Sequence, residues 1–155
     1  MKSNETPKWF LDALAQKPDI KTVKIKGSKI SYNCWGEKNK PGLIFVHGGM
    51  AHADWWNFIT PYFLKTHRVI AMNLGGMGDS EWRKEYSTET WGLEIEGVCK
   101  KEKLKKPIII GHSLGGMCGV YAASIMKKNL YGLVIVDTAI LPPSDKPPKF
   151  DFKIR

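Results

Sequence analysis

The chain is a succession of short apolar runs separated by polar, glycine-containing segments. Unbroken apolar runs are typical of strands that are covered on both faces of a parallel sheet. Such runs occur at 43–46, 107–110 and 133–136, and a further strand is predicted at 67–72. Two earlier β-rich runs, 20–25 and 30–35, are joined through Gly27 and predict a β-hairpin.

Apolar residues at helical spacing predict the elements between these strands. The clearest helix begins at Leu114, where apolar residues recur three and four positions apart as far as Ile125. Ser87 is a good N-cap for a second helix that reaches about residue 103. Shorter helices are predicted at 9–15 and 54–64, the latter with a proline inside. The predicted fold class is α/β, with a mostly parallel sheet and helices on both faces.

One five-residue turn carries the strongest chemical signal, Gly111-His112-Ser113-Leu114-Gly115. It lies between a predicted buried strand and a predicted helix, which is the context of a nucleophile elbow. The strained turn needs neighbours without a Cβ, and Gly111 and Gly115 meet that need. The turn directs the N–H of Leu114 and the positive end of the helix dipole toward the Ser113 hydroxyl. The alternative, a glycine-rich turn with an idle serine, is less favoured in this context.

A second motif, His47-Gly48-Gly49, follows another predicted buried strand. Sites in open α/β sheets lie at the carboxyl ends of the strands, where both motifs are expected. The N–H of Gly49 and that of Leu114 would form a two-donor oxyanion hole. Loss of one such donor typically costs about 3 kcal/mol of transition-state stabilisation. The histidines lack the spacing of metal ligands, so neither a metal nor another cofactor is expected.

These motifs resemble those of the α/β-hydrolase family. The resemblance rests on 46–49, 76–80 and 111–116, extends over about residues 9–143, and includes esterase-like aromatic pairs at 9–10 and 55–56. It implies Ser113 as nucleophile, an acyl-enzyme mechanism and a small-molecule acyl substrate, as in carboxylic ester hydrolases. Serine at the elbow disfavours epoxide hydrolase and haloalkane dehalogenase chemistry, because those relatives use aspartate there. Asn73 stands where the family usually has aspartate, and we expect an effect on loop packing.

The remainder of a catalytic triad is not evident. The family order is serine, acid, histidine, yet no histidine follows Ser113 in this sequence. His112 is a poor candidate base, because neighbouring strand residues point to opposite faces. Asp137 stands where some relatives place the acid, although an aspartate that caps a loop is the preferred interpretation. We therefore expect the base to come from outside this chain, and the alternative function is a non-catalytic binding module on the same fold.

The predicted organisation is a helical segment at 1–18, a core with six strands at 19–141, and the beginning of a lid or linker at 142–155. This arrangement predicts the N-terminal part of a longer hydrolase, a fold that is incomplete at its C-terminal side. The strand at 133–136 would leave an apolar sheet edge unpaired, which favours self-association.

Composition and charge bear on three further questions: nucleic-acid binding, membrane insertion and the state of the cysteines. The net charge is +9, but the lysine clusters lack interleaved aromatic residues, so a solvated basic surface is preferred over a nucleic-acid site. No apolar stretch is long enough to cross a membrane, and the N-terminus has no signal-like apolar core, which predicts a cytoplasmic protein. The three cysteines are expected to be reduced and buried.

Overall fold

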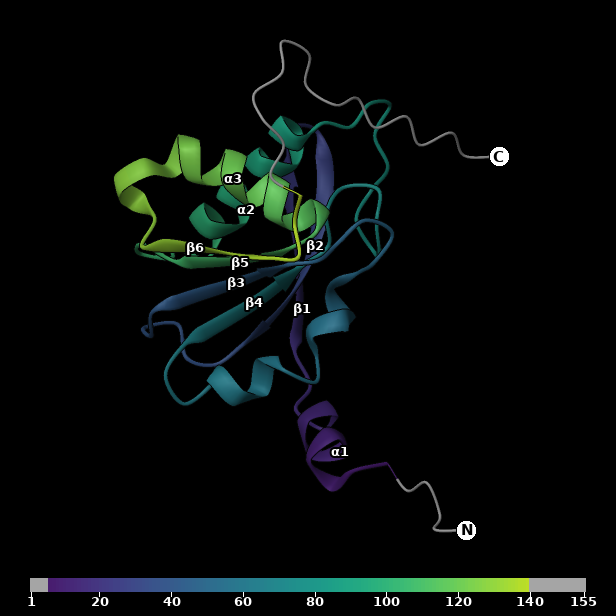
Figure 1. The fold of residues 1–155 in the computed structure, drawn as a ribbon, viewed down its shortest axis with the longest axis vertical. Coiled ribbons are helices and arrows are strands. Elements are labelled where there is room, and N and C mark those ends of the chain that lie inside the picture. The colour runs from purple at the N-terminus through teal and green to yellow at the C-terminus, as the bar shows by residue number, and fades with distance from the viewer. Residues whose placement is uncertain (1–5, 140–155) are drawn as a thin grey trace.

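The computed structural model describes residues 6–139. Six strands form one mixed sheet in the order β1-β2-β4-β3-β5-β6 (Figure 1). Their bounds are β1 Asp19–Ile25, β2 Ser28–Trp35, β3 Gly42–Val46, β4 Arg68–Met72, β5 Ile108–His112 and β6 Gly132–Val136. The strands β3 to β6 run parallel, whereas β2 is antiparallel to both β1 and β4. The predicted fold class and hairpin are therefore confirmed.

The hairpin closes more tightly than the sequence suggests. Only Lys26 and Gly27 lie between the two strands, with φ of 49° and 85°. Positive φ at both central residues matches the right-handed twist of the strands that the turn connects.

Helices cover both faces of the sheet, as predicted. The helices α2, Thr88–Lys101, and α3, Leu114–Met126, lie side by side on one face (Figure 1). The other face carries two short 3₁₀ helices, Ala53–Trp56 and Thr60–Phe63, and beyond them α1, Lys8–Leu14. A third 3₁₀ turn, Lys127–Asn129, follows α3. Ser87 caps α2 as predicted, accepting the N–H of Thr90 at 3.2 Å.

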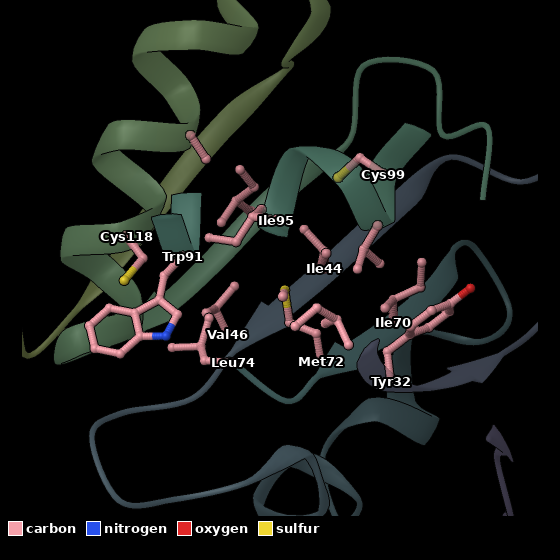
Figure 2. Packing of buried hydrophobic residues seen from close by; sticks show 14 of the residues in the cluster. Tyr32, Ile44, Val46, Ile70, Met72, Leu74, Trp91, Ile95, Cys99 and Cys118 are labelled. Atoms are coloured by element: carbon pink, nitrogen blue, oxygen red, sulfur yellow. The ribbon is translucent and has the colours of Figure 1, made fainter. Parts of the chain in front are cut away.

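The core consists of two apolar layers, one on each side of the sheet. Residues of β3 alternate between them: Ile44 and Val46 belong to the layer under α2 and α3, and Phe45 to the other. Figure 2 shows the first layer, in which Trp91 from α2 lies close to Cys118 from α3. The three cysteines are free and buried, which confirms that expectation.

The predicted helix over 54–64 is wrong. Two 3₁₀ helices replace it, and Pro61 stands in the first turn of the second one. A proline has no N–H to donate and disfavours the helical conformation of the residue before it, so a continuous helix breaks here. The α1 helix packs on this region through one ring only, Phe10 on Phe58 at 5.8 Å between centroids. Its Trp9 and Leu11 are each 53% exposed, so the expected packing of its aromatic residues holds only in part.

A polar cluster joins the start of β4 to the end of α2. The Glu102 carboxylate accepts from Arg68 at 2.9 Å, from Tyr32 at 2.9 Å and from Lys21 at 3.2 Å. Burial alone would raise the pKa of Glu102, but these hydrogen bonds hold it at about 2. The carboxylate is therefore charged at neutral pH and balances the buried Arg68 guanidinium.

The predicted lid or linker at 142–155 lies outside the described residues. Within them, β6 is an edge strand on which Val134 and Val136 are exposed. Self-association through this edge stays a prediction. No helix in residues 6–139 is long and apolar enough to cross a membrane.

Candidate active site

Ser113 occupies a strained turn between β5 and α3. Its φ is 50° and its ψ is −118°, a region that residues with a side chain rarely adopt. The surrounding chain holds this conformation from both sides. The Ser113 N–H donates to the Val136 carbonyl at 3.0 Å, and the Thr138 hydroxyl donates to the Ser113 carbonyl at 3.0 Å.

The glycines of this turn are required by close packing. A Cβ on Gly115 would lie 2.5 Å from the carbonyl oxygen of His47, and one on Gly111 would lie 2.6 Å from the carbonyl carbon of Gly115. A Cβ on Gly116 would collide with the Thr138 side chain. The contacts of Gly111 and Gly115 are with backbone atoms, which cannot move aside. The fold therefore requires glycine at both positions of the turn around Ser113.

The sheet brings the two sequence motifs together. Strands β3 and β5 are neighbours, and Val46 pairs with Gly111 at the ends of those strands. The loop that follows β3 therefore meets Ser113: a Cβ on Gly48 would lie 3.3 Å from the Ser113 Cβ. A hollow of about 330 Å³ opens at this meeting point. Its walls include Gly49, Met50, Ser113, Leu114, Met117 and Thr138.

The geometry leaves two backbone donors beside the serine. Leu114 is the first residue of α3, and Gly49 belongs to the loop after β3; both line the hollow with Ser113. Among residues 6–139, neither N–H has a protein acceptor. Donors arranged in this way can stabilise an oxyanion that forms on a carbonyl attacked by the serine.

His47 has a structural task in this arrangement. It is fully buried; its Nδ1 donates to the Gly48 carbonyl at 2.7 Å, and its Nε2 accepts the Leu74 N–H at 3.1 Å. Burial lowers the pKa of His47 to about 4 despite the bond to Gly48. A neutral ring with this one tautomer satisfies both bonds, so His47 fastens the loop after β3 to the loop after β4.

The His112 ring packs beside the loop after β3 and makes no hydrogen bond to Ser113 in the described residues. A Cβ on Gly48 would be 2.8 Å from His112 Nδ1, so the ring borders the loop after β3. The ring stacks on Trp55, with 5.7 Å between centroids and 29° between planes. This stacking holds the imidazole against an exposed indole on the far side of the loop from α3.

The remaining histidines and Asp137 contact residues other than Ser113, or are exposed. Asp137 is exposed, with φ of 47°, directly after β6. His52 is 3.8 Å from the Asp54 carboxylate, and His67 bonds to Thr66 at 2.8 Å. In the described part of the chain, no histidine is hydrogen-bonded to Ser113 or to Asp137. The same residues contain no cluster of three or more potential metal ligands.

The loop after β4 is packed by buried polar groups. Asn73 is buried, and its side-chain oxygen accepts the Ala53 N–H at 2.6 Å. A neutral amide satisfies this donor without burying a charge, in line with the expected effect on loop packing. Gly78 packs so closely on Asn73 that a side chain there would collide with the amide.

Three features of the site escaped prediction from the sequence. They are the support of Ser113 by Thr138, the stacking of Trp55 on His112, and the position of Met50 at the rim. Each depends on residues that are far apart in the chain or in irregular segments. No periodic pattern marks such contacts.

Comparison with known proteins agrees with this fold. The family described as alpha/beta hydrolase fold matches residues 41–153. Human "Epoxide hydrolase 4" is 25% identical over 118 residues, covering 74% of this chain and 33% of that protein. An esterase of Mycobacterium tuberculosis is 28% identical over 116 residues, covering 74% of this chain and 38% of that protein. The chain spans between about a third and somewhat more than half of the length of the curated relatives it matches.

A solved structure has a similar three-dimensional fold. A bacterial membrane phospholipase A superposes with a TM-score of 0.76 at 25% identity, covering 86% of this chain and 43% of that one. The similarity extends over nearly all of the described residues.

Proposed function

The chain belongs to the α/β-hydrolase fold family, and from this premise we propose that it is a serine hydrolase acting on carboxylic esters, with Ser113 as nucleophile. One observation carries the proposal. Ser113 is held at a strained φ of 50° beside two backbone N–H groups that have no acceptor in residues 6–139. Backbone strain at one residue, with hydrogen-bond donors close to its side chain, is characteristic of a functional site.

The proposed reaction follows the acyl-enzyme route. The Ser113 Oγ forms a bond to the ester carbonyl carbon while a base takes the hydroxyl proton. The carbonyl oxygen becomes negative and accepts hydrogen bonds from the N–H groups of Gly49 and Leu114. The carbon–oxygen bond to the alcohol then breaks, and the alcohol leaves with the proton. Water attacks the resulting ester of Ser113 by the same steps and releases the acid.

The choice of ester over epoxide rests on the elbow residue. A carboxylate that opens an epoxide forms an ester, which water can hydrolyse. A serine hydroxyl that opened an epoxide would form an ether, which has no carbonyl for water to attack. Ser113 therefore favours the chemistry of the esterase relative over that named for human "Epoxide hydrolase 4".

Labelling with a fluorophosphonate probe tests the proposal. We expect slow covalent labelling of the wild-type chain and none of Ser113→Ala. Added imidazole should accelerate labelling of the wild type, because no histidine in residues 6–139 is hydrogen-bonded to Ser113. Equal labelling of both proteins, or none of a folded wild type with imidazole present, would refute the assignment. His112→Ala is a control, expected to label like the wild type because its ring stacks on Trp55.

A non-catalytic binding module is the second candidate. It is favoured by the same lack of a histidine partner for Ser113 in the described residues. Under this alternative, Ser113→Ala would leave ligand binding unchanged and no probe would react.

A further inference from the structure

A second cavity, of about 380 Å³, lies beside the Ser113 hollow and has no part in the reaction described above. Residues 50–52 after β3 and 75–78 after β4 form two of its sides. Trp82 and Tyr86, from the segment that leads into α2, and Trp91, from α2 itself, form the third. Its volume falls within the range of roughly 300–1,000 Å³ that is usual for small-molecule sites.

The lining of this cavity suits an uncharged apolar group. None of its residues is Asp, Glu, Lys or Arg, and methionine and aromatic residues make up five of the ten that line it, beside His52, one alanine and three glycines. The Trp91 indole N–H donates to the Gly75 carbonyl at 3.1 Å, and the Tyr86 hydroxyl accepts the Arg83 N–H at 2.8 Å. These polar atoms bind the protein's own backbone. A charged ligand would find no Asp, Glu, Lys or Arg side chain in this lining, which makes its burial costly.

The aromatic side of the cavity is built into a closed ring of contacts. The Gly75 N–H donates to one oxygen of the buried Glu94 carboxylate at 2.8 Å. The other oxygen accepts from the Arg83 guanidinium at 2.9 Å. The Arg83 N–H binds the Tyr86 hydroxyl, and the Tyr86 ring stacks on Trp91 at 5.5 Å. The Trp91 bond to Gly75 closes the ring, so these groups are fixed before any ligand arrives.

The glycines of the loop after β4 leave room for the aromatic side of the cavity. A Cβ on Gly76 would collide with the Tyr86 hydroxyl, and Gly76 has φ of 79°, where a side chain is disfavoured. The glycine-rich run that the sequence shows at 75–78 thus allows the aromatic side chain to lie against the loop.

One residue connects this cavity to the serine. Met50 lines both the cavity and the Ser113 hollow, and it is 85% exposed with φ of 61°. A ligand that passes over this flexible thioether side chain can occupy both spaces at once. A carbonyl group would lie at Ser113 and an apolar chain or ring in the cavity.

We infer that the cavity binds the apolar substituent of an ester whose carbonyl is attacked by Ser113. The substrate class is an uncharged carboxylic ester with an aliphatic chain or ring long enough to cross Met50. This inference rests on the proposed function for the position of the carbonyl, but the cavity's affinity for apolar groups can be measured separately.

Methionine methyl groups report on the two spaces independently. In protein labelled with ¹³C at the methionine methyls, 1-octanol should shift the signals of Met50 and Met77, while Met72 in the core stays unmoved. Trp82→Ala should weaken octanol binding roughly three- to tenfold, because one exposed aromatic surface is lost. Trp55→Ala is the matched control: it removes another tryptophan that is more than half exposed but lies outside the cavity lining, and it should leave the affinity unchanged. Absence of a Met77 shift, or equal weakening by both variants, would overturn the inference.

Alkyl fluorophosphonates of different length then connect the cavity to the serine. An octyl probe should label Ser113 at least tenfold faster than an ethyl probe, and Trp82→Ala should reduce this ratio of rates. Equal rates for the two probes would overturn the inference while leaving the hydrolase proposal intact. Octanol shifts at Met77 without labelling by either probe would refute the hydrolase proposal and, with it, the assignment of the cavity to an ester.

Discussion

Replacing Ser113 by glycine should stabilise the fold while abolishing reaction with a fluorophosphonate. The prediction follows from the backbone of Ser113, with φ of 50° and ψ of −118°. Glycine adopts positive φ without the clash that a Cβ causes. The serine side chain also makes no capping hydrogen bond to α3, so its removal forfeits none.

The expected gain comes from two opposing effects. A residue with a side chain held in a sparsely populated backbone region costs of order 1–3 kcal/mol. Glycine loses about 0.5–1 kcal/mol through the greater freedom of the unfolded chain. The free energy of unfolding should therefore rise by roughly 0.5–2 kcal/mol in Ser113→Gly. In Ser113→Ala the Cβ and its strain remain, and stability should stay within about 0.5 kcal/mol of the wild type.

Urea unfolding at constant slope measures these differences. Lys127 provides a matched control, because it has nearly the same backbone angles, φ of 48° and ψ of −122°, at the other end of α3. Lys127→Gly should be stabilised to a similar degree and should keep the labelling of the wild type. A Ser113→Gly protein less stable than the wild type, beside a stabilised Lys127→Gly, would refute the idea that strain is stored at the serine.

Three further predictions concern the surroundings of the site. Gly115→Ala should lower the urea midpoint by an amount equivalent to about 2–3 kcal/mol, because its Cβ would lie 2.5 Å from the His47 carbonyl oxygen. Gly132→Ala is the control: a Cβ there has no atom within 4 Å, so this variant should match the wild type. Similar losses of stability in both variants would contradict the packing argument. Glu102→Gln should cost about 3 kcal/mol at pH 7 by leaving the buried Arg68 without its carboxylate. That difference in urea midpoint should shrink as the pH falls from 4.5 toward 2, where wild-type Glu102 also becomes neutral, and a constant difference would count against the role of its charge. Between pH 6.5 and about 4, His47 is protonated in the unfolded chain but not in the folded one. His47 should therefore make the free energy of unfolding decrease as the pH is lowered through that range. Urea midpoints that do not change there would contradict the buried, neutral state of His47.

The sequence predicts the strands β3 and β4 well because they are buried on both faces. Residues such as Ile44 and Phe45 point to opposite apolar layers, so the whole run must be apolar, and that signal is visible without the structure. The elbow around Ser113 is predictable for a related reason. Its glycines are fixed by backbone contacts that any such turn must make.

Other parts of the site depend on contacts that no local pattern encodes. The Arg83 side chain binds Glu94 on α2 and the carbonyl of Ile25 at the end of β1, which joins three separate segments around the cavity. The segment at 54–64 has helix-like apolar spacing, but Pro61 and the packing of its rings on β3 favour two shorter 3₁₀ turns. In the first case the decisive partners lie elsewhere in the chain; in the second, Pro61 inside the segment breaks the helix and Phe45 of β3 supplies the distant packing partner.

The two hydrogen bonds that hold the Ser113 backbone have a consequence for the order of assembly. Both partners, Val136 and Thr138, come later in the chain than the serine itself. Chains are synthesised from the N-terminus and their folded parts form in that direction. A nascent chain can therefore pair β3 with β5 before the turn has its outer support. We expect Ser113, the proposed nucleophile, to reach this backbone geometry only when β6 has been translated and has joined the sheet, so that any reactivity would follow formation of the surrounding core.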